Sequence, residues 1–148
     1  MTDAPRSRGP VVVDTAVFAA ELTRSGTTLA ELYRPVLEGR NVFVSFVTEA
    51  EERFGARLAG WGAPRVGRLE QRLAAVEVVW PGPELVEEYA DLRAWCVTNG
   101  HGLGQKAHEA DRWIAATARW MNVPLIAHDS IFRDIDGLEL LSQLGDEP

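Results

Sequence analysis

The chain has little cysteine, no long apolar run and few basic residues, and each shortage excludes a class of protein. A single cysteine, Cys96, excludes an internal disulfide framework and a four-cysteine zinc site. No segment approaches the ~18 consecutive apolar residues that a membrane helix needs, and residues 1–10 contain no apolar signal core. We therefore expect a cytoplasmic protein that acts without a membrane.

Basic residues are outnumbered: 15 Lys and Arg stand against 22 Asp and Glu, which gives a formal net charge of −7. This balance excludes a generally basic nucleic-acid-binding protein. Lys106 is the only lysine, so contacts with phosphate would be made mainly by the forked guanidinium of arginine.

The 148 residues predict one α/β domain. Five apolar runs without alternation are typical of strands covered on both faces: 11–14, 41–46, 76–80, 124–129 and, more weakly, 138–141. The segments between them have helical patterns: 15–24, 27–38, 47–60, 64–75, 83–99 and 106–121. Alternating strands and helices predict a parallel sheet with helices on both faces. We expect the domain to cover 11–142, with 1–10 and 143–148 as loose ends.

Two aspartates directly follow predicted strands. Asp14 ends the first run and Asp129 ends the fourth. Ligands of open parallel sheets bind beyond the carboxyl ends of the strands, where the strand order reverses. Each aspartate alone has an ordinary alternative role as a helix N-cap.

Glu51 lies on a predicted helix and has two interpretations. With Thr48 as N-cap it completes a capping box. It also lies on the same side of the helix as Phe54 and Leu58, at the edge of an expected buried face, from which a carboxylate can reach inward.

Asp111 is harder to explain as a structural residue. We expect it in the middle of a helix, off the polar face formed by Glu109, Arg112, Ala116 and Arg119. Aspartate is unfavourable inside a helix, and an unpaired buried charge is costly. Either a buried arginine pairs with Asp111 or the fold directs it towards a site.

Several carboxylates in one place repel each other unless a cation compensates them. Sites with only oxygen ligands suit Mg²⁺ or Mn²⁺, which keep several waters and also bind phosphate oxygens. Such ions activate water and stabilise the leaving oxygen of a phosphodiester. The four acids therefore suggest hydrolysis of a nucleic-acid backbone.

Four segments carry a resemblance to a known family: VVVDT (11–15), SFVTEAEERFGA (45–56), HEADRWIAATA (108–118) and HDSIF (128–132). In this order and spacing, the chain resembles the PIN-domain ribonucleases and, among them, the VapC toxins of bacterial toxin–antitoxin systems. The resemblance covers about residues 11–142.

The resemblance implies a three-layer α/β/α fold whose five parallel strands lie in the order 3-2-1-4-5. It implies that four acids bind one or two Mg²⁺ or Mn²⁺ ions for RNA cleavage: Asp14, Glu51, Asp111 and Asp129. It also implies a toxin that inhibits translation by cutting tRNA or rRNA, a VapB-type antitoxin, and a homodimer or a toxin–antitoxin hetero-oligomer. Weaker candidates for contact with substrate are Thr15, Arg53, Arg57 and His128.

The chain departs from the family pattern at three positions. Ala16 and Ala110 replace frequent asparagines, and Glu52 follows Glu51 where leucine is usual. Loss of an amide at Ala16 would weaken metal binding. A non-catalytic PIN-like binding module is therefore the alternative. Asp134 and Asp136 are candidate accessory acids.

Single residues disfavour three other functional interpretations of the sequence. A haloacid-dehalogenase-type phosphatase needs an aspartate where Ala16 stands, and a phosphoacceptor receiver domain needs an aspartate where Trp80 ends the third strand. The glycine-rich segment 102–106 lacks the ending of a phosphate loop. Among the tryptophans, Trp61 is the one expected to be exposed, which is compatible with a homodimer.

Overall fold

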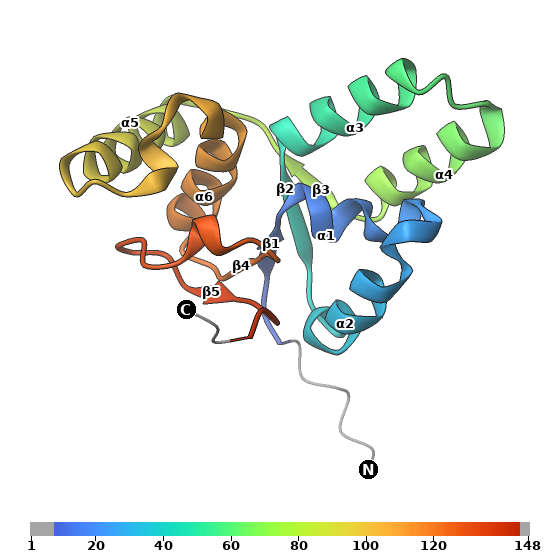
Figure 1. Cartoon of the computed structure of the whole chain (residues 1–148), viewed down its shortest axis with the longest axis horizontal. Coiled ribbons are helices and arrows are strands. Elements are labelled where there is room, and N and C mark those ends of the chain that lie inside the picture. The colour runs from blue at the N-terminus through green and yellow to red at the C-terminus, as the bar shows by residue number, and fades with distance from the viewer. Residues whose placement is uncertain (1–7, 146–148) are drawn as a thin grey trace, which may run out of the picture.

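The computed structural model describes residues 8–145, so 1–7 and 146–148 of the expected loose ends lie outside the described residues. All the strands in the described part are parallel and form one sheet in the order β3-β2-β1-β4-β5, as predicted (Figure 1). The strands are β1 (Val11–Val13), β2 (Val42–Ser45), β3 (Glu77–Val79), β4 (Leu125–Ile126) and β5 (Leu140–Leu141).

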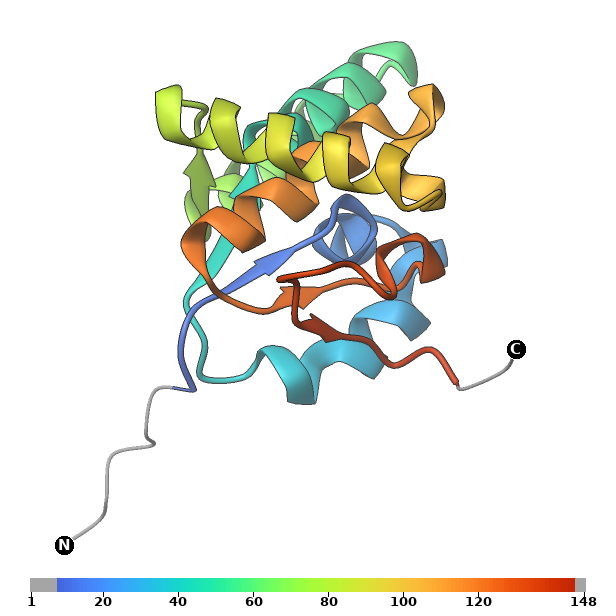
Figure 2. The ribbon, with the colours of Figure 1, turned by 90° about the vertical axis from the view of Figure 1, so that its left-hand side faces the viewer.

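Helices lie on both faces of this sheet. The α-helices are α1 (Thr15–Ala19), α2 (Thr27–Leu37), α3 (Phe46–Leu58), α4 (Ala63–Ala74), α5 (Pro83–Thr98) and α6 (Glu109–Met121). The short 3-10 helices are η1 (Ala20–Leu22), η2 (Arg24–Gly26), η3 (Gly102–Gly104), η4 (Lys106–His108) and η5 (Ser130–Phe132). Figure 2 shows α5 lying across α6 on one side of the sheet, and Figure 1 shows α3 and α4 as a hairpin on the other.

The central strand β1 explains the three layers. Its valines are almost completely buried and their side chains alternate. Val12 packs in the hydrophobic cluster that contains residues of α5 and α6, whereas Val11 and Val13 pack in the cluster of α1, α2 and α4. A strand buried on both faces needs apolar residues at every position, which is why the run at 11–13 shows no alternation.

Arg112 corrects the prediction for α6. The sequence pattern places it on a polar, solvent-facing side with Ala116, but both residues are buried. The Arg112 guanidinium donates to the carbonyl oxygen of Leu103 at 3.0 Å, to that of Gln105, and to the Tyr89 hydroxyl at 3.1 Å. These partners satisfy the buried charge and tie the η3–η4 segment to α6.

Two predictions about apolar side chains are also wrong. Phe54 and Leu58 do not mark a buried face, because their exposed fractions are 65% and 75%. Trp61, predicted to be the exposed tryptophan, is half-buried under the guanidinium of Arg65, which lies 4.2 Å from the ring centroid, while Trp80 is 61% exposed.

None of the helices within residues 8–145 has the length and apolar character that a membrane span requires.

Candidate active site

Asp14 lies where β1 meets α1, at the centre of the sheet. Its backbone N–H donates to the carbonyl oxygen of Ile126 in β4 at 3.0 Å. Its Oδ1 accepts from the N–H of Val17 at 2.9 Å, so Asp14 is indeed the N-cap of α1. Capping and a role in a site are therefore compatible, since the cap hydrogen bond fixes the direction of the carboxylate.

The surroundings of Asp14 disfavour its charged form. Its pKa is raised to about 6, chiefly by burial and also by the negative charges of Asp111 and Asp129, against the lowering effect of hydrogen bonds from the backbone N–H groups of Val17 and His128. The fold thus brings three of the four predicted acids within electrostatic reach of one another.

Asp129 and Asp111 begin helical segments on neighbouring elements. Asp129 is exposed and caps η5, with Oδ1 accepting from the N–H of Ile131 at 2.9 Å. Asp111 lies in the first turn of α6, where a negative charge is favourable, and not in the middle of the helix as predicted. Its Oδ2 is 3.2 Å from Nδ1 of His108, so the expected alternative of a buried arginine partner is wrong.

Glu51 approaches the same region from α3. The Thr15 hydroxyl donates to Oε1 of Glu51 at 3.3 Å and lies 2.9 Å from the hydroxyl of buried Thr48. Ser45, not Thr48, is the N-cap of α3, which excludes the capping box. Burial, together with the charge of Asp111, raises the pKa of Glu51. Thr48, which the sequence pattern suggested as the N-cap, therefore lies within α3 and contacts the Thr15 hydroxyl that holds Glu51.

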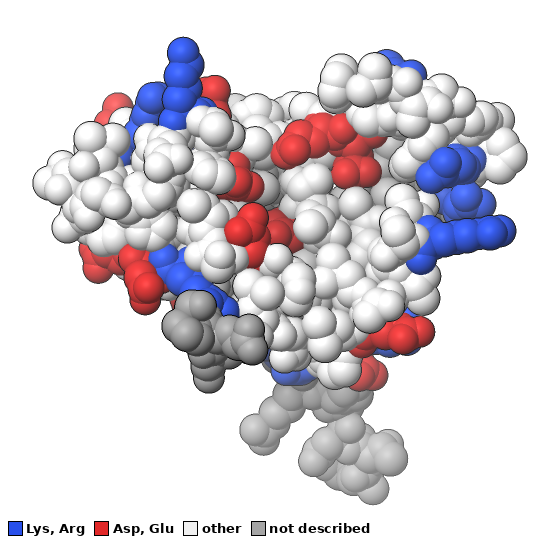
Figure 3. Space-filling view, viewed as in Figure 1, with Lys and Arg blue, Asp and Glu red and all other residues white. Residues whose placement is uncertain are grey.

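Acidic side chains gather at the centre of the face shown in Figure 3, between α3 and α6. Within residues 8–145, no ion pair joins Asp14, Glu51, Asp111 or Asp129 to a lysine or an arginine. Next to Glu51, half-buried Glu52 has its pKa raised by burial and by the charge of Glu51, which shows that negative charge is crowded here. Within the described residues, the negative charge at this edge of the sheet therefore has no lysine or arginine partner, and His108 is the basic side chain that contacts it.

The donor atoms fit a hard divalent cation, although they do not form a closed cage. Among the described residues, no three histidine, cysteine or acidic side chains are arranged as a ready set of metal ligands. Mg²⁺ is ordinarily held by one or two carboxylates and completes its octahedron with waters and phosphate oxygens. Carboxylates that surround an opening, such as these, suit that mode of binding.

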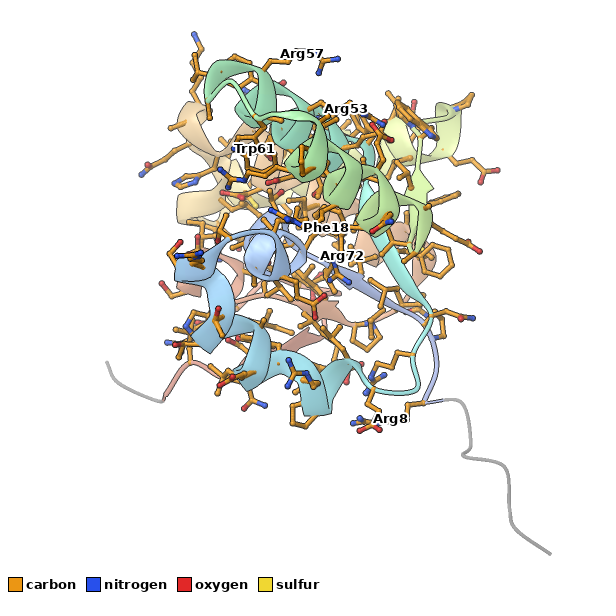
Figure 4. The ribbon with its side chains drawn as sticks, turned by 90° about the vertical axis from the view of Figure 1, so that its right-hand side faces the viewer. Arg8, Phe18, Arg53, Arg57, Trp61 and Arg72 are labelled. Atoms are coloured by element: carbon orange, nitrogen blue, oxygen red, sulfur yellow. The ribbon has the colours of Figure 1, made fainter. Side chains whose placement is uncertain are left out.

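The remaining candidates occupy different places. His128 lies beside the acids, and its Nδ1 is 2.8 Å from the hydroxyl of Tyr33. Arg53 pairs with Glu70 on α4 and, at 3.6 Å, with Glu49. Arg57 donates to the carbonyl oxygen of Arg53 at 3.1 Å. As Figure 4 shows, both arginines belong to the α3–α4 hairpin, and the structure does not join them to the four acids.

Tyr33 is the residue of this region that the sequence motifs missed. It is completely buried on α2, and its hydroxyl also contacts the carbonyl oxygen of Ala127 at 3.1 Å and accepts from the N–H of Gln143 at 2.9 Å. Tyr33 therefore connects the segment that carries His128 and Asp129 to the chain after β5. Nothing in the local pattern of α2 marks it, because all three partners are distant in sequence.

The sequence and the fold both match known proteins. The family model "PIN domain" matches residues 11–138. Ribonuclease VapC5 of Mycobacterium tuberculosis is 34% identical over 128 residues, which cover 85% of this chain and 87% of that protein.

Solved toxin–antitoxin complexes share the fold. VapBC2 from Rickettsia felis, bound to a DNA fragment from its promoter, matches with a TM-score of 0.74 and 16% identity, over 90% of this chain and 98% of that one. VapBC-5 from Mycobacterium tuberculosis matches with a TM-score of 0.61 and 27% identity, again over 90% and 98% of the two chains.

Proposed function

Because the chain belongs to the PIN-domain family and, within it, to the VapC ribonucleases, we propose that it is a Mg²⁺- or Mn²⁺-dependent endoribonuclease. Its cellular role in this proposal is that of the toxin of a toxin–antitoxin pair, which cuts tRNA or rRNA and thereby inhibits translation.

The observation that carries the proposal is the gathering of Asp14, Glu51, Asp111 and Asp129 at the carboxyl edge of the sheet without a lysine or arginine partner among the described residues. The pKa of Asp14, raised to about 6 chiefly by burial and also by Asp111 and Asp129, supports the view that the protein alone disfavours this charge. Asp14, Glu51, Asp111 and Asp129 would hold a divalent cation, which would supply the missing compensation and would also attract phosphate oxygens.

The chain's own residues hold the carboxylates in place for this chemistry. Asp14 and Asp129 are each fixed by a backbone N–H that donates to Oδ1, and the Thr15 hydroxyl holds Glu51. A bound Mg²⁺ or Mn²⁺ ion would supply Lewis-acid chemistry, activating water and stabilising the leaving oxygen. Rigid carboxylates lower the cost of assembling such a site, because little side-chain freedom is lost on binding.

The proposed partners are a VapB-type antitoxin and the RNA substrate. The antitoxin is supported by the structural likeness to VapBC complexes. A homodimer or a toxin–antitoxin hetero-oligomer remains a prediction, and so does contact of Thr15, Arg53, Arg57 or His128 with RNA.

Cleavage of total RNA by the purified, antitoxin-free protein tests the proposal, with Mn²⁺, with Mg²⁺ and with EDTA, beside the Asp14→Asn variant. We expect discrete products that require the metal and disappear in the variant. If the correctly folded protein neither cleaves RNA nor binds metal in calorimetry, the enzyme is excluded and the non-catalytic binding module replaces it.

A further inference from the structure

A hollow of about 570 Å³ lies between the η1–η2 turn and α4, apart from the four acids. Its lining consists of Leu22, Thr23, Arg24, Ser25, Arg65 and Arg68. Three of these six side chains are arginines, two carry hydroxyl groups, and only one is apolar. Basic side chains are visible beside α4 at the right-hand margin of Figure 3.

The three arginines of the hollow form no ion pair in the part of the chain that the structure describes. Within residues 8–145, no carboxylate lies within 4.0 Å of Arg24, Arg65 or Arg68. On the same helix, in contrast, Arg72 pairs with Glu21 at 3.4 Å. What distinguishes Arg24, Arg65 and Arg68 is that they line one hollow together, which concentrates positive charge locally in a chain of net charge −7. They repel each other unless an anion lies between them.

The geometry of the hollow is fixed from two sides. The guanidinium of Arg65 stacks on Trp61, 4.2 Å from the ring centroid, which leaves the donors in its plane available. On the other side, Thr23 accepts from the N–H of Gly26 at 3.1 Å. Any side chain at Gly26 would collide with the carbonyl oxygen of Ala20, so glycine permits η2 to fold back on η1.

We propose that this hollow binds a backbone phosphate of the RNA substrate, several nucleotides from the scissile bond. The inference rests on the proposed ribonuclease function, and the chemistry of the lining favours phosphate. Guanidinium groups bind phosphate oxygens in pairs, and threonine and serine hydroxyls donate to them. An amphipathic protein segment would need more apolar surface than Leu22 provides.

The hollow lies close enough to Asp14 along the chain for one RNA strand to contact both the acids and the hollow. Only α1 and η1 separate Asp14 from Thr23, a path of at most about 20 Å. A stacked strand advances about 3.4 Å along its axis per nucleotide, so a strand with its scissile bond at the acids reaches the hollow within about six nucleotides.

Binding of a short oligouridylate by the catalytically silent Asp14→Asn protein tests the proposal over a range of salt concentrations. Substitution of Arg24, Arg65 and Arg68 by glutamine is compared with Arg93→Gln, which removes an exposed arginine on α5. We expect the triple variant to bind roughly tenfold more weakly, with a salt slope shallower by about 0.7 for each lost phosphate contact. Arg93→Gln should bind as the parent does.

Two further measurements separate the outcomes. Equal oligouridylate affinity and salt slope in the triple variant and in Arg93→Gln would overturn the phosphate site, even if the protein with Asp14 intact cleaves RNA. Failure of that protein to cleave RNA would remove the proposed enzyme and leave any measured phosphate binding in place. Loss of binding to oligoglutamate, with oligouridylate binding retained, would assign the hollow to an acidic protein segment and overturn the RNA proposal.

Discussion

At the scale of one residue, the ionised carboxylate of Asp14 destabilises the folded protein, although the proposed metal site requires it. Its pKa is about 6 in the folded protein against an ordinary value of 3.8. The folded state therefore holds the proton more tightly than the unfolded state, and stability falls as pH rises from about 4 to about 6. At neutral pH the ionised carboxylate costs on the order of 3 kcal/mol.

Asp14→Asn should therefore stabilise the metal-free protein at neutral pH. Asparagine keeps the cap on α1 but carries no charge. We expect a gain of about 1–3 kcal/mol in the free energy of unfolding in EDTA, which disappears near pH 4. Urea unfolding measures it, with Asp91→Asn on α5 as the control that should not show this pH dependence. A less stable Asp14→Asn protein would contradict the stated cause of the pKa shift.

The same proton should control catalysis. Below pH 6 a cation must displace the proton of Asp14 before the carboxylate can bind it. We expect kcat/KM for RNA cleavage with Mg²⁺ to rise about tenfold per pH unit below about 6 and then to level off, because this ratio reports the pKa values of the free enzyme. A flat profile between about pH 5 and pH 7 would show that Asp14 does not have to ionise.

At the scale of elements, Tyr33 links α2 to the segment that carries Asp129. Tyr33→Phe leaves Gln143 N–H and Nδ1 of His128 without their partner, which should cost about 1–3 kcal/mol. Because the segment that carries Asp129 would be held less firmly, we expect kcat for RNA cleavage to fall by a larger factor than KM rises. Ser142→Ala is the control. It removes a hydroxyl that lies 3.4 Å from Tyr33 and accepts from the N–H of Leu144, but it keeps the contacts of Tyr33 with His128 and Gln143. Equal effects of both substitutions on stability and kcat would contradict this role.

The strands were predictable because burial on both faces leaves a local mark, a run of apolar residues at 11–13 without alternation. The position of Asp14 and Asp129 at the edge of the sheet was predictable too, since residues that directly follow strands lie there by geometry alone. The start of α6 was not predictable in this way, because the 3-10 helix η4 directly precedes it and was predicted as its first turn.

Arg112 shows why the rest depends on tertiary structure. A helical pattern assigns arginine to solvent, which is correct for most arginines. Here the carbonyl oxygens of Leu103 and Gln105 and the hydroxyl of Tyr89 satisfy its donors inside the protein. Partners from other elements leave no periodic mark on α6. The same holds for the Thr15–Thr48 contact beside Glu51, which joins α1 to α3.

At the scale of the whole molecule, charge is separated by position. The net charge of −7 predicts weak attraction for RNA, but the acids lie at the centre of one face and basic side chains lie beside α4 at its margin (Figure 3). The proposed divalent cation at the acids would convert the centre from repelling to attracting phosphate. If the cation binds there, the stability of the folded protein should depend on it.

Excess Mg²⁺ should reverse the order of stability between the parent protein and Asp14→Asn. A ligand that binds only the folded state stabilises it by about 2.7 kcal/mol at a hundredfold excess over Kd, or several degrees in Tm for a domain of this size. The parent protein should gain this stability, whereas Asp14→Asn, which lacks the buried carboxylate, should gain much less. Thermal unfolding in Mg²⁺ and in EDTA measures both. An equal gain in the two proteins would show that the ion binds away from Asp14, and the acid cluster would then lose its assignment as the metal centre.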